Sequence, residues 1–323
     1  MPFKPPYFLT LLACLVVFGA CDLLNFDNEN PSIPGKVVYS TPANNSSSQI
    51  FTAYTNGQGT RQLTHFKNGG ATNPVWSPDG KHIAFNTDEY FYSSAGVGIY
   101  TMDANGENIE VLRNKEGFTL LGTGMEWSPD GTKIAYHSCP NCVSGGYTNI
   151  YVYDLTTQEL TRVTNNEGSS RFPSWSADSK QLAFLSNRDY IIGNQYLINS
   201  DIYIMNIDGT NIQRVTDSAG VGRPSWDSTG QYLVFNKYVD SIIKLRLYSL
   251  QKDSLLPIED SFTKDQVIQA ARWSKQTNTL FLDIRNKETK LHKYFFFDIE
   301  SKEVTPFGFK PVKRIQADWY SGE

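Results

Sequence analysis

The segment Trp76-Ser77-Pro78-Asp79-Gly80, followed by Ile83-Ala84-Phe85, decides the fold because it returns along the chain. The same five residues occupy positions 127–131, and altered copies begin at the later tryptophans. Successive tryptophans are 46 to 51 residues apart. They are Trp76, Trp127, Trp175, Trp226, Trp273 and Trp319. A period of this length is typical of stacked or circular repeat folds. Six equivalent copies indicate that these side chains pack between repeats.

Each repeat predicts four short strands joined by hairpins. Pro and Asp-Gly favour a tight turn after the tryptophan strand. In the second complete repeat, Ile134-Ala135-Tyr136 follows this turn, Ile150-Tyr151-Val152-Tyr153 follows a variable loop, and a last strand ends at Val163-Thr164. Sequential short strands suit a propeller blade or a sandwich, and the fixed period favours the propeller.

The two ends of the repeat region predict a closed ring. Trp319-Tyr320 follows a first strand, whereas the segment from Gly35 to Tyr39 matches the start of a second strand. The sixth repeat is therefore divided, and pairing of the last residues beside Val37 would complete it. We predict an all-β fold: a single six-bladed β-propeller over residues 35–323, with four antiparallel strands in each blade of roughly 48 residues.

Composition narrows the class of protein. The 323 residues carry 33 acidic and 29 basic side chains, a formal net charge of −4. A nucleic-acid partner is not expected, because such a protein needs a basic stripe to neutralise phosphates. Aromatic residues make up 13% of the chain, which favours sheets. No apolar run after residue 20 is long enough to span a bilayer.

The first 34 residues predict export. Lys4 precedes an apolar stretch over residues 7–19, which is typical of a signal peptide covering residues 1–20. The ending Gly19-Ala20-Cys21 resembles a bacterial lipobox, so we expect Cys21 to carry lipid and residues 21–34 to form a flexible tether. The alternative is an ordinary signal peptide cut near Ala20. The expected location is the periplasmic or cell-surface face of a bacterial membrane, with the lipid as the only membrane contact.

The repeat resembles a known family. Residues 74–85 follow the pattern Pro-x-Trp-Ser-Pro-Asp-Gly-Lys-x-Ile-Ala-Phe, and Ile99-Tyr100-Thr101-Met102 and a final Val-Thr complete it. This pattern looks like the TolB-type β-propeller repeat, and the resemblance covers residues 35–323. It implies a six-bladed periplasmic propeller that binds partner proteins of the cell envelope. TolB-type proteins also have an N-terminal α/β domain, which we expect to be missing, because only residues 22–34 precede the repeats.

Similar propellers also occur in prolyl oligopeptidase-class serine peptidases and in oligogalacturonate lyases, so the fold alone does not decide function. The sequence contains no Gly-x-Ser-x-Gly, no P-loop and no His-Glu-x-x-His. We therefore expect no catalytic residue, no metal and no cofactor. Lyase-type propellers gather histidines on one face to hold a metal. Here we expect His65 and His137 on one face and His82 and His292 on the opposite one, as unrelated side chains.

Cys139 and Cys142 lie in a predicted loop as Cys-Pro-Asn-Cys. In an oxidising compartment we expect a local disulfide. Free thiols and a metal or redox function are the alternatives.

The second-to-third and fourth-to-first connections of a blade emerge on the same face, which we call the long-loop face. These connections carry nearly all of the length variation. Loops on a rigid scaffold concentrate binding residues, and aromatic side chains are favoured anchors. The candidate partner-binding residues are Tyr90, Phe91, Tyr92, Tyr147, Tyr190 and Tyr196. The alternative is that these side chains pack over the blade edges.

The innermost strands also carry charges. The candidate channel-lining residues are Glu126, Arg171, Arg223, Arg272 and Asp318. They could hold a small polar ligand or an ion, contact water, or pair with each other. We predict an exported, membrane-anchored, non-catalytic binding or scaffold protein of the bacterial cell envelope, with an envelope protein docked on the long-loop face. The alternative is a glycan-binding or carbohydrate-active propeller, similar to oligogalacturonate lyase, that uses the channel mouth.

Overall fold

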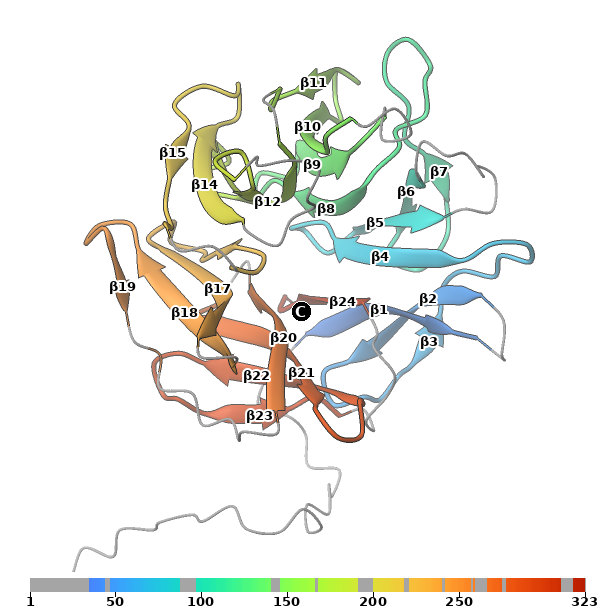
Figure 1. Ribbon diagram of the computed structural model, residues 1–323. Helices are drawn as coiled ribbons and strands as arrows, with labels where there is room; N and C mark the ends of the chain where they lie inside the picture. Colours follow the sequence, from blue (N-terminus) through green and yellow to red (C-terminus); the bar gives the residue numbers. More distant parts are fainter. Residues whose placement is uncertain are drawn as a thin grey trace, which may run out of the picture.

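The computed structural model describes residues 35–43, 47–87, 97–140, 146–165, 168–190, 200–217, 221–239, 242–256, 258, 266–274, 277–308 and 316–322. These residues form β-strands in six four-stranded antiparallel sheets and contain no helix. Figure 1 shows the sheets arranged as blades around a common centre. The predicted all-β six-bladed propeller is therefore confirmed. No apolar helix of bilayer-spanning length occurs within the described ranges.

The strands follow the same order in every blade, from the innermost strand outward. Blade 1 contains β24 (Gln316–Tyr320), β1 (Lys36–Pro42), β2 (Ser48–Tyr54) and β3 (Arg61–Gln62). Blade 2 contains β4 (Ala71–Trp76), β5 (His82–Thr87), β6 (Gly98–Asp103) and β7 (Glu110–Val111). Blade 3 contains β8 (Thr123–Trp127), β9 (Lys133–Ser138), β10 (Asn149–Asp154) and β11 (Leu160–Arg162).

The remaining three blades repeat this order. Blade 4 contains β12 (Ser170–Trp175), β13 (Gln181–Ser186), β14 (Asp201–Asn206) and β15 (Gln213–Arg214). Blade 5 contains β16 (Ser225–Trp226), β17 (Tyr232–Val239), β18 (Ile242–Ser249) and β19 (Ser254–Leu256). Blade 6 contains β20 (Gln266–Trp273), β21 (Thr279–Asn286), β22 (His292–Asp298) and β23 (Val304–Pro306).

The ring closes in blade 1, as the sequence predicted. Strand β24 pairs antiparallel with β1, and Trp319 lies opposite Val37. The two strands lie side by side near the centre of Figure 1. This pairing gives β1 a neighbour on both sides, so that it is not left as an edge strand.

The turn after each tryptophan explains why the motif recurs. Ser77 Oγ donates a hydrogen bond to Asp79 Oδ1 at 2.6 Å and accepts one from the backbone N–H of His82 at 2.9 Å. Gly80 has a φ of 66°, a value that glycine adopts without strain. The same serine-to-aspartate bond joins Ser128 to Asp130. The motif thus fixes the hairpin between the first and second strands.

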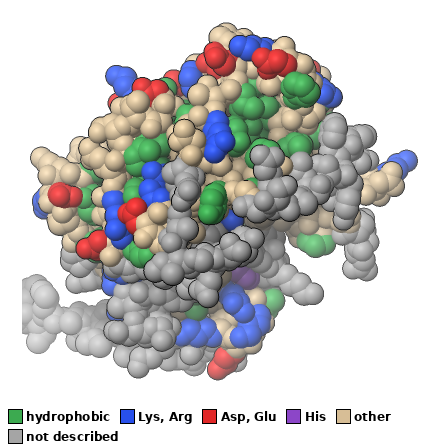
Figure 2. Space-filling model, turned by 45° about the horizontal axis from the view of Figure 1, so that its top comes forward, with side chains coloured by type: hydrophobic (Ala, Val, Ile, Leu, Met, Phe, Trp, Pro, Cys, Tyr) green, Lys and Arg blue, Asp and Glu red, His purple; other side chains and the backbone are tan. Residues whose placement is uncertain are grey.

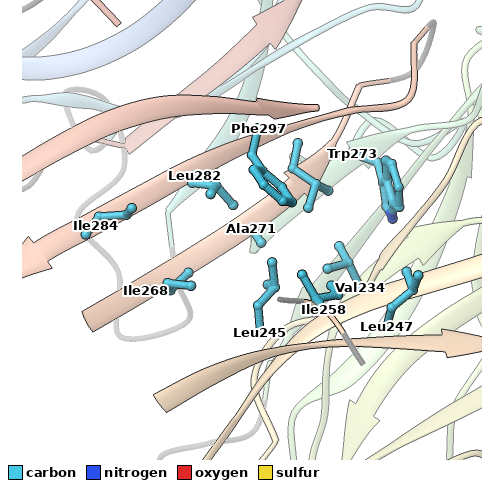
Figure 3. Packing of buried hydrophobic residues seen from close by; sticks show 11 residues of the cluster. Val234, Leu245, Leu247, Ile258, Ile268, Ala271, Trp273, Leu282, Ile284 and Phe297 are labelled. Atoms are coloured by element: carbon cyan, nitrogen blue, oxygen red, sulfur yellow. The ribbon is translucent and has the colours of Figure 1, made fainter. Parts of the chain in front are cut away.

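The hydrophobic core consists of six clusters, one at each interface between neighbouring blades. Each of the six tryptophans belongs to a different cluster and is at most 8% exposed. Figure 3 shows the cluster between blades 5 and 6, where Trp273, Ile268 and Phe297 face Val234 and Leu245. Burial of these large side chains therefore stabilises the packing of one blade against the next, whereas backbone hydrogen bonds join the strands within a blade.

Candidate functional site

The innermost strands surround a central channel. Two adjoining cavities of about 60 Å³ each lie in this channel and share Val75, Met125, Arg223 and Arg272 in their walls. Each is large enough to hold several water molecules. The two cavities are thus large enough to accept a small polar group inside the ring of blades.

A backbone irregularity at the same position of three blades shapes the wall of the channel. The residue three positions before the tryptophan has a positive φ in blades 2, 3 and 4: Asn73 at 52°, Gly124 at 64° and Phe172 at 53°. The pairing register shifts at these points, as in a β-bulge. Such bulges redirect side chains, and a bulky residue such as Phe172 rarely adopts this conformation. Similar strain is common at functional sites.

Charged residues just before three of the tryptophans tie one blade to the next. Asp318 Oδ2 accepts a hydrogen bond from the backbone N–H of Trp76 at 2.9 Å. Glu126 Oε1 accepts one from Trp175 at 3.3 Å. Arg272 Nη1 lies 3.5 Å from Asp318 Oδ1. Three of the five candidate channel residues are therefore brought into blade-to-blade contacts around the channel.

The other two candidate channel residues gather in a basic cluster beside blades 3, 4 and 5. The guanidinium carbon of Arg223 lies 3.8 Å from the centre of the Phe172 ring. The His137 ring meets the same phenyl ring edge-on at 4.8 Å, and its Nδ1 accepts a hydrogen bond from the backbone N–H of Phe172 at 3.3 Å. Burial, together with the positive charges of Arg171 and Arg223, lowers the pKa of His137 to about 3. His137 is therefore neutral at physiological pH.

Neither Phe172 nor His137 was predicted to belong to this group. The available signal was position: Phe172 and Arg223 both stand three residues before a tryptophan, in neighbouring repeats. We call Arg171, Phe172, Arg223 and His137 the basic cluster.

One histidine was placed on the wrong face. His292 begins β22 and lies opposite Arg285 near the end of β21, so it belongs to the long-loop face together with His137 and not to the opposite face. The reason is that a third strand starts at the end where the second strand stops. His292 is buried and its Nδ1 lies 2.6 Å from Asp283 Oδ1. Within the described ranges, no three His, Cys, Asp or Glu side chains gather as a metal site.

Two of the six candidate loop aromatics lie within the described residues. Tyr147 is 42% exposed on the long-loop face. The Tyr190 hydroxyl instead donates a hydrogen bond to Asp201, and Arg214 donates one to the same hydroxyl at 2.6 Å. Tyr190 is thus held against blade 4. Tyr90, Phe91, Tyr92 and Tyr196 lie outside the described residues.

Sequence reasoning missed two exposed aromatic residues, one of which is Tyr54 at the end of β2, 51% exposed. Phe118, in the connection from β7 to β8, is 70% exposed. In Figure 2 the apolar side chains drawn in colour are scattered among polar ones and do not form one continuous patch.

The structure tests the predicted disulfide for only one of the two cysteines. Cys139 is disulfide-bonded. Cys142 lies outside the described residues, so its pairing with Cys139 stays a prediction. The expected signal peptide, Cys21 and the tether also lie outside them.

Residues 92–304 match the family model described as the TolB beta propeller domain. The chain belongs to the TolB β-propeller family. Among curated relatives, this TolB propeller is 34% identical over 115 residues to the uncharacterized peptidase YuxL of Bacillus subtilis, covering 35% of this chain and 16% of the relative. It is 25% identical over 246 residues to the uncharacterized protein Atu1656 of Agrobacterium fabrum, covering 62% and 80%. It is 34% identical over 96 residues to the Tol-Pal system protein TolB of Francisella tularensis, covering 29% and 19%.

Solved structures share the fold of this TolB propeller. TolB from Acinetobacter baumannii superposes with a TM-score of 0.66 at 18% identity, covering 88% of this chain and 66% of that one. An oligogalacturonate lyase from Vibrio parahaemolyticus superposes with a TM-score of 0.53 at 13% identity, covering 84% and 73%. At these identities the likeness concerns the fold, which TolB proteins share with enzymes.

Proposed function

We propose that this TolB propeller is an exported, non-catalytic binding protein of the bacterial cell envelope, anchored to a membrane by lipid on Cys21. Its partner is an envelope protein that docks on the long-loop face. Membership of the TolB family supports the envelope role. The observation that carries the docking face is the exposure of Tyr147 there, because exposed aromatic side chains on a rigid scaffold are favoured binding anchors.

A multiple variant on the long-loop face and a control variant on the opposite face test the docking face. Tyr147 on the long-loop face is 42% exposed, and Ile212, beside the third-to-fourth turn of blade 4 on the opposite face, is 41% exposed. Tagged full-length protein is cross-linked in cells and recovered from detergent-solubilised membranes. Changing Tyr147 together with Tyr90, Phe91 and Tyr92 to Ser is expected to reduce recovery of the cross-linked envelope protein about tenfold or more. Ile212→Ser is expected to leave recovery unchanged, and equal recovery by both variants contradicts the proposed face.

The anchor is tested separately with Cys21→Ser. The wild-type protein is expected to incorporate labelled palmitate and to sediment with membranes. The variant is expected to do neither, because its acyl chains would be missing. Unchanged membrane sedimentation of Cys21→Ser would contradict a lipid anchor at this residue.

A further inference from the structure

The hairpin between β21 and β22 projects from the long-loop face of blade 6. Strand β21 contains eight residues, whereas β5, β9 and β13, which occupy the same place in blades 2, 3 and 4, contain six each. The two additional residues, Arg285 and Asn286, stand at the end that leads into the second-to-third connection. At about 3.4 Å per residue, they carry the hairpin about 7 Å further out than its counterparts.

Hydrogen bonds within the turn hold this hairpin in one shape. Asn286 Oδ1 accepts hydrogen bonds from the backbone N–H groups of Glu288 at 2.9 Å and Thr289 at 2.8 Å. At the base of the hairpin, Ile284 is buried between blades 5 and 6, and His292 is buried beside it. A turn fixed in this way loses little conformational entropy when a partner binds it.

The hairpin carries an excess of positive charge. Its cations are Arg285, Lys287, Lys290 and Lys293, and its only acidic residue is Glu288. The three lysines are exposed and the arginine is half-buried. Within the described ranges, Arg285, Lys290 and Lys293 form no ion pair. The Lys290 ammonium donates a hydrogen bond to the backbone carbonyl of Lys287, a contact that leaves its charge in place.

These cations surround the hairpin. Lys293 lies opposite Ile284, whose side chain packs towards blade 5. Arg285 lies opposite His292, and this pair occupies the other face of the hairpin, because successive side chains of a strand alternate between faces. The other two lysines belong to the turn. Residues 285–293, which we call the basic prong, therefore present positive charge on both faces and at the tip.

We propose that the basic prong is a docking element that binds an acidic surface of the partner protein. This inference rests on the proposed function, since it names the chemistry by which the partner is recognised. Complementary charge speeds the encounter of two proteins and rejects partners of the wrong sign. Blade 6 lies opposite blade 3 in the ring, so a partner that contacts both the prong and Tyr147 covers the mouth of the channel.

An anionic lipid surface fits the prong less well than an acidic protein does. Surfaces that bind membranes combine cations with exposed apolar side chains that enter the headgroup region. None of the exposed large hydrophobic residues of the described ranges belongs to the prong. Stable recruitment by charge alone takes clusters of about four to eight cations, whereas Glu288 reduces the net charge of the prong to that of three.

Matched charge reversals test the prong in cells. Lys290→Glu combined with Lys293→Glu is expected to reduce recovery of the cross-linked envelope protein about tenfold or more. Lys252→Glu combined with Lys302→Glu makes the same change of charge at exposed turns of blades 5 and 6 on the opposite face. Lys290 and Lys302 are matched in backbone as well, with φ values of 61° and 63°. This control is expected to stay within about twofold of wild type. Equal recovery by the two double variants overturns the proposal.

A second variant separates charge from folding. Lys290→Arg combined with Lys293→Arg keeps both charges and is expected to recover the envelope protein as wild type does. Loss of recovery in this variant would show that charge is not what the partner recognises. Both lysines are exposed, so the melting temperatures of the Glu and Arg variants are expected to equal that of wild type.

A titration tests the prong without the cellular partner. The full chain is titrated with a fluorescein-labelled peptide of alternating Gly and Glu, and with the matched peptide of alternating Gly and Gln. The Glu peptide alone is expected to bind, about tenfold more weakly at about 300 mM salt than at about 50 mM, because exposed charges are screened. The Lys290→Glu, Lys293→Glu protein is expected not to bind it. Sedimentation of wild type, but not of this variant, with phosphatidylglycerol vesicles, together with no binding of the Glu peptide, would assign the prong to anionic lipid and contradict the proposal.

The two proposals fail in different ways. If the Lys290→Glu, Lys293→Glu protein recovers the cross-linked envelope protein as well as wild type does, while the variant that includes Tyr147→Ser does not, the prong is contradicted and the docking face stands. If the Glu peptide binds through both lysines but wild type recovers no envelope protein, the prong stands and the proposed function is contradicted.

Discussion

The Asp318 carboxylate accepts a hydrogen bond from the backbone N–H of Trp76 at 2.9 Å, although 242 residues separate the two in sequence. The same relationship joins Glu126 to Trp175, Ser174 to Trp226 and Ser225 to Trp273. At four of the six positions, the residue before one tryptophan thus binds the backbone of the next tryptophan around the ring. This contact orients neighbouring innermost strands, while the tryptophan side chains fill the space behind them.

Replacing Asp318 tests this belt of contacts. Asp318→Ala removes the acceptor for the Trp76 N–H and the partner of Arg272, so we expect a loss of about 1–3 kcal/mol in the free energy of unfolding. Asp318→Asn keeps an oxygen acceptor and is expected to lose less, because the partly exposed ion pair contributes little. Urea unfolding followed by tryptophan fluorescence measures both. Equal stability of Asp318→Ala and wild type would show that the contact is dispensable.

Thr164, two residues after the fourth strand of blade 3, offers a second test. Buried Thr164 Oγ1 accepts a hydrogen bond from the backbone N–H of Ile150 at 2.9 Å and donates one to Asn149 at 3.2 Å. Thr164→Val keeps the shape but leaves a buried N–H without an acceptor, which is expected to cost about 1–3 kcal/mol. Thr161→Val, at an exposed position of β11, is expected to change stability by less than about 0.5 kcal/mol. Similar losses in both variants would contradict a specific role for the buried hydroxyl.

His137 makes stability depend on pH. Its pKa is about 3 in the folded protein, against about 6.5 in an unfolded chain. Between these values the unfolded chain binds a proton that the folded protein does not. The free energy of unfolding therefore falls by about 1.4 kcal/mol for each unit that the pH drops through this window, and this group has no effect above it.

His137→Asn removes this acid sensitivity. In blades 2 and 5 the position equivalent to His137 is occupied by Asn86 and Asn236. Each of these side chains donates a hydrogen bond to a backbone carbonyl of the next blade at 2.8 Å. Between about pH 6 and pH 4 we expect the variant to lose roughly 2–3 kcal/mol less stability than wild type. The control is His65→Asn at an exposed position, which is expected to follow the wild-type curve. Parallel curves for wild type and His137→Asn would contradict a neutral, buried imidazole.

The repeat spacing predicted much of the fold because each feature it used is local. Pro78-Asp79-Gly80 encodes a hairpin turn. This turn fixes the register of the two strands that it joins, β4 and β5, and therefore which of their side chains share a face. Ring closure was also predictable, since Val37 and Trp319 occupy matching positions of one divided repeat. The error over His292 came from counting strands without following the direction in which each one runs.

The site was harder to predict because it depends on relations between blades. Nothing in the residues around Arg171 indicates that Glu126, in the neighbouring blade, accepts a hydrogen bond from Trp175 and forms no ion pair with Arg171. The bulge that gives Phe172 a positive φ is equally hidden, because phenylalanine has no preference for that conformation. Such features follow from the packing of whole sheets against each other.

The pairing of β1 with β24 has a consequence for biogenesis. Strand β1 is among the first parts of the propeller to leave a ribosome or a translocation pore, yet its inner partner is made about 280 residues later. Throughout that delay, Val37 and Val38 belong to an incomplete sheet that another chain could join. Shielding of this strand until synthesis ends is therefore expected to increase the yield of folded protein.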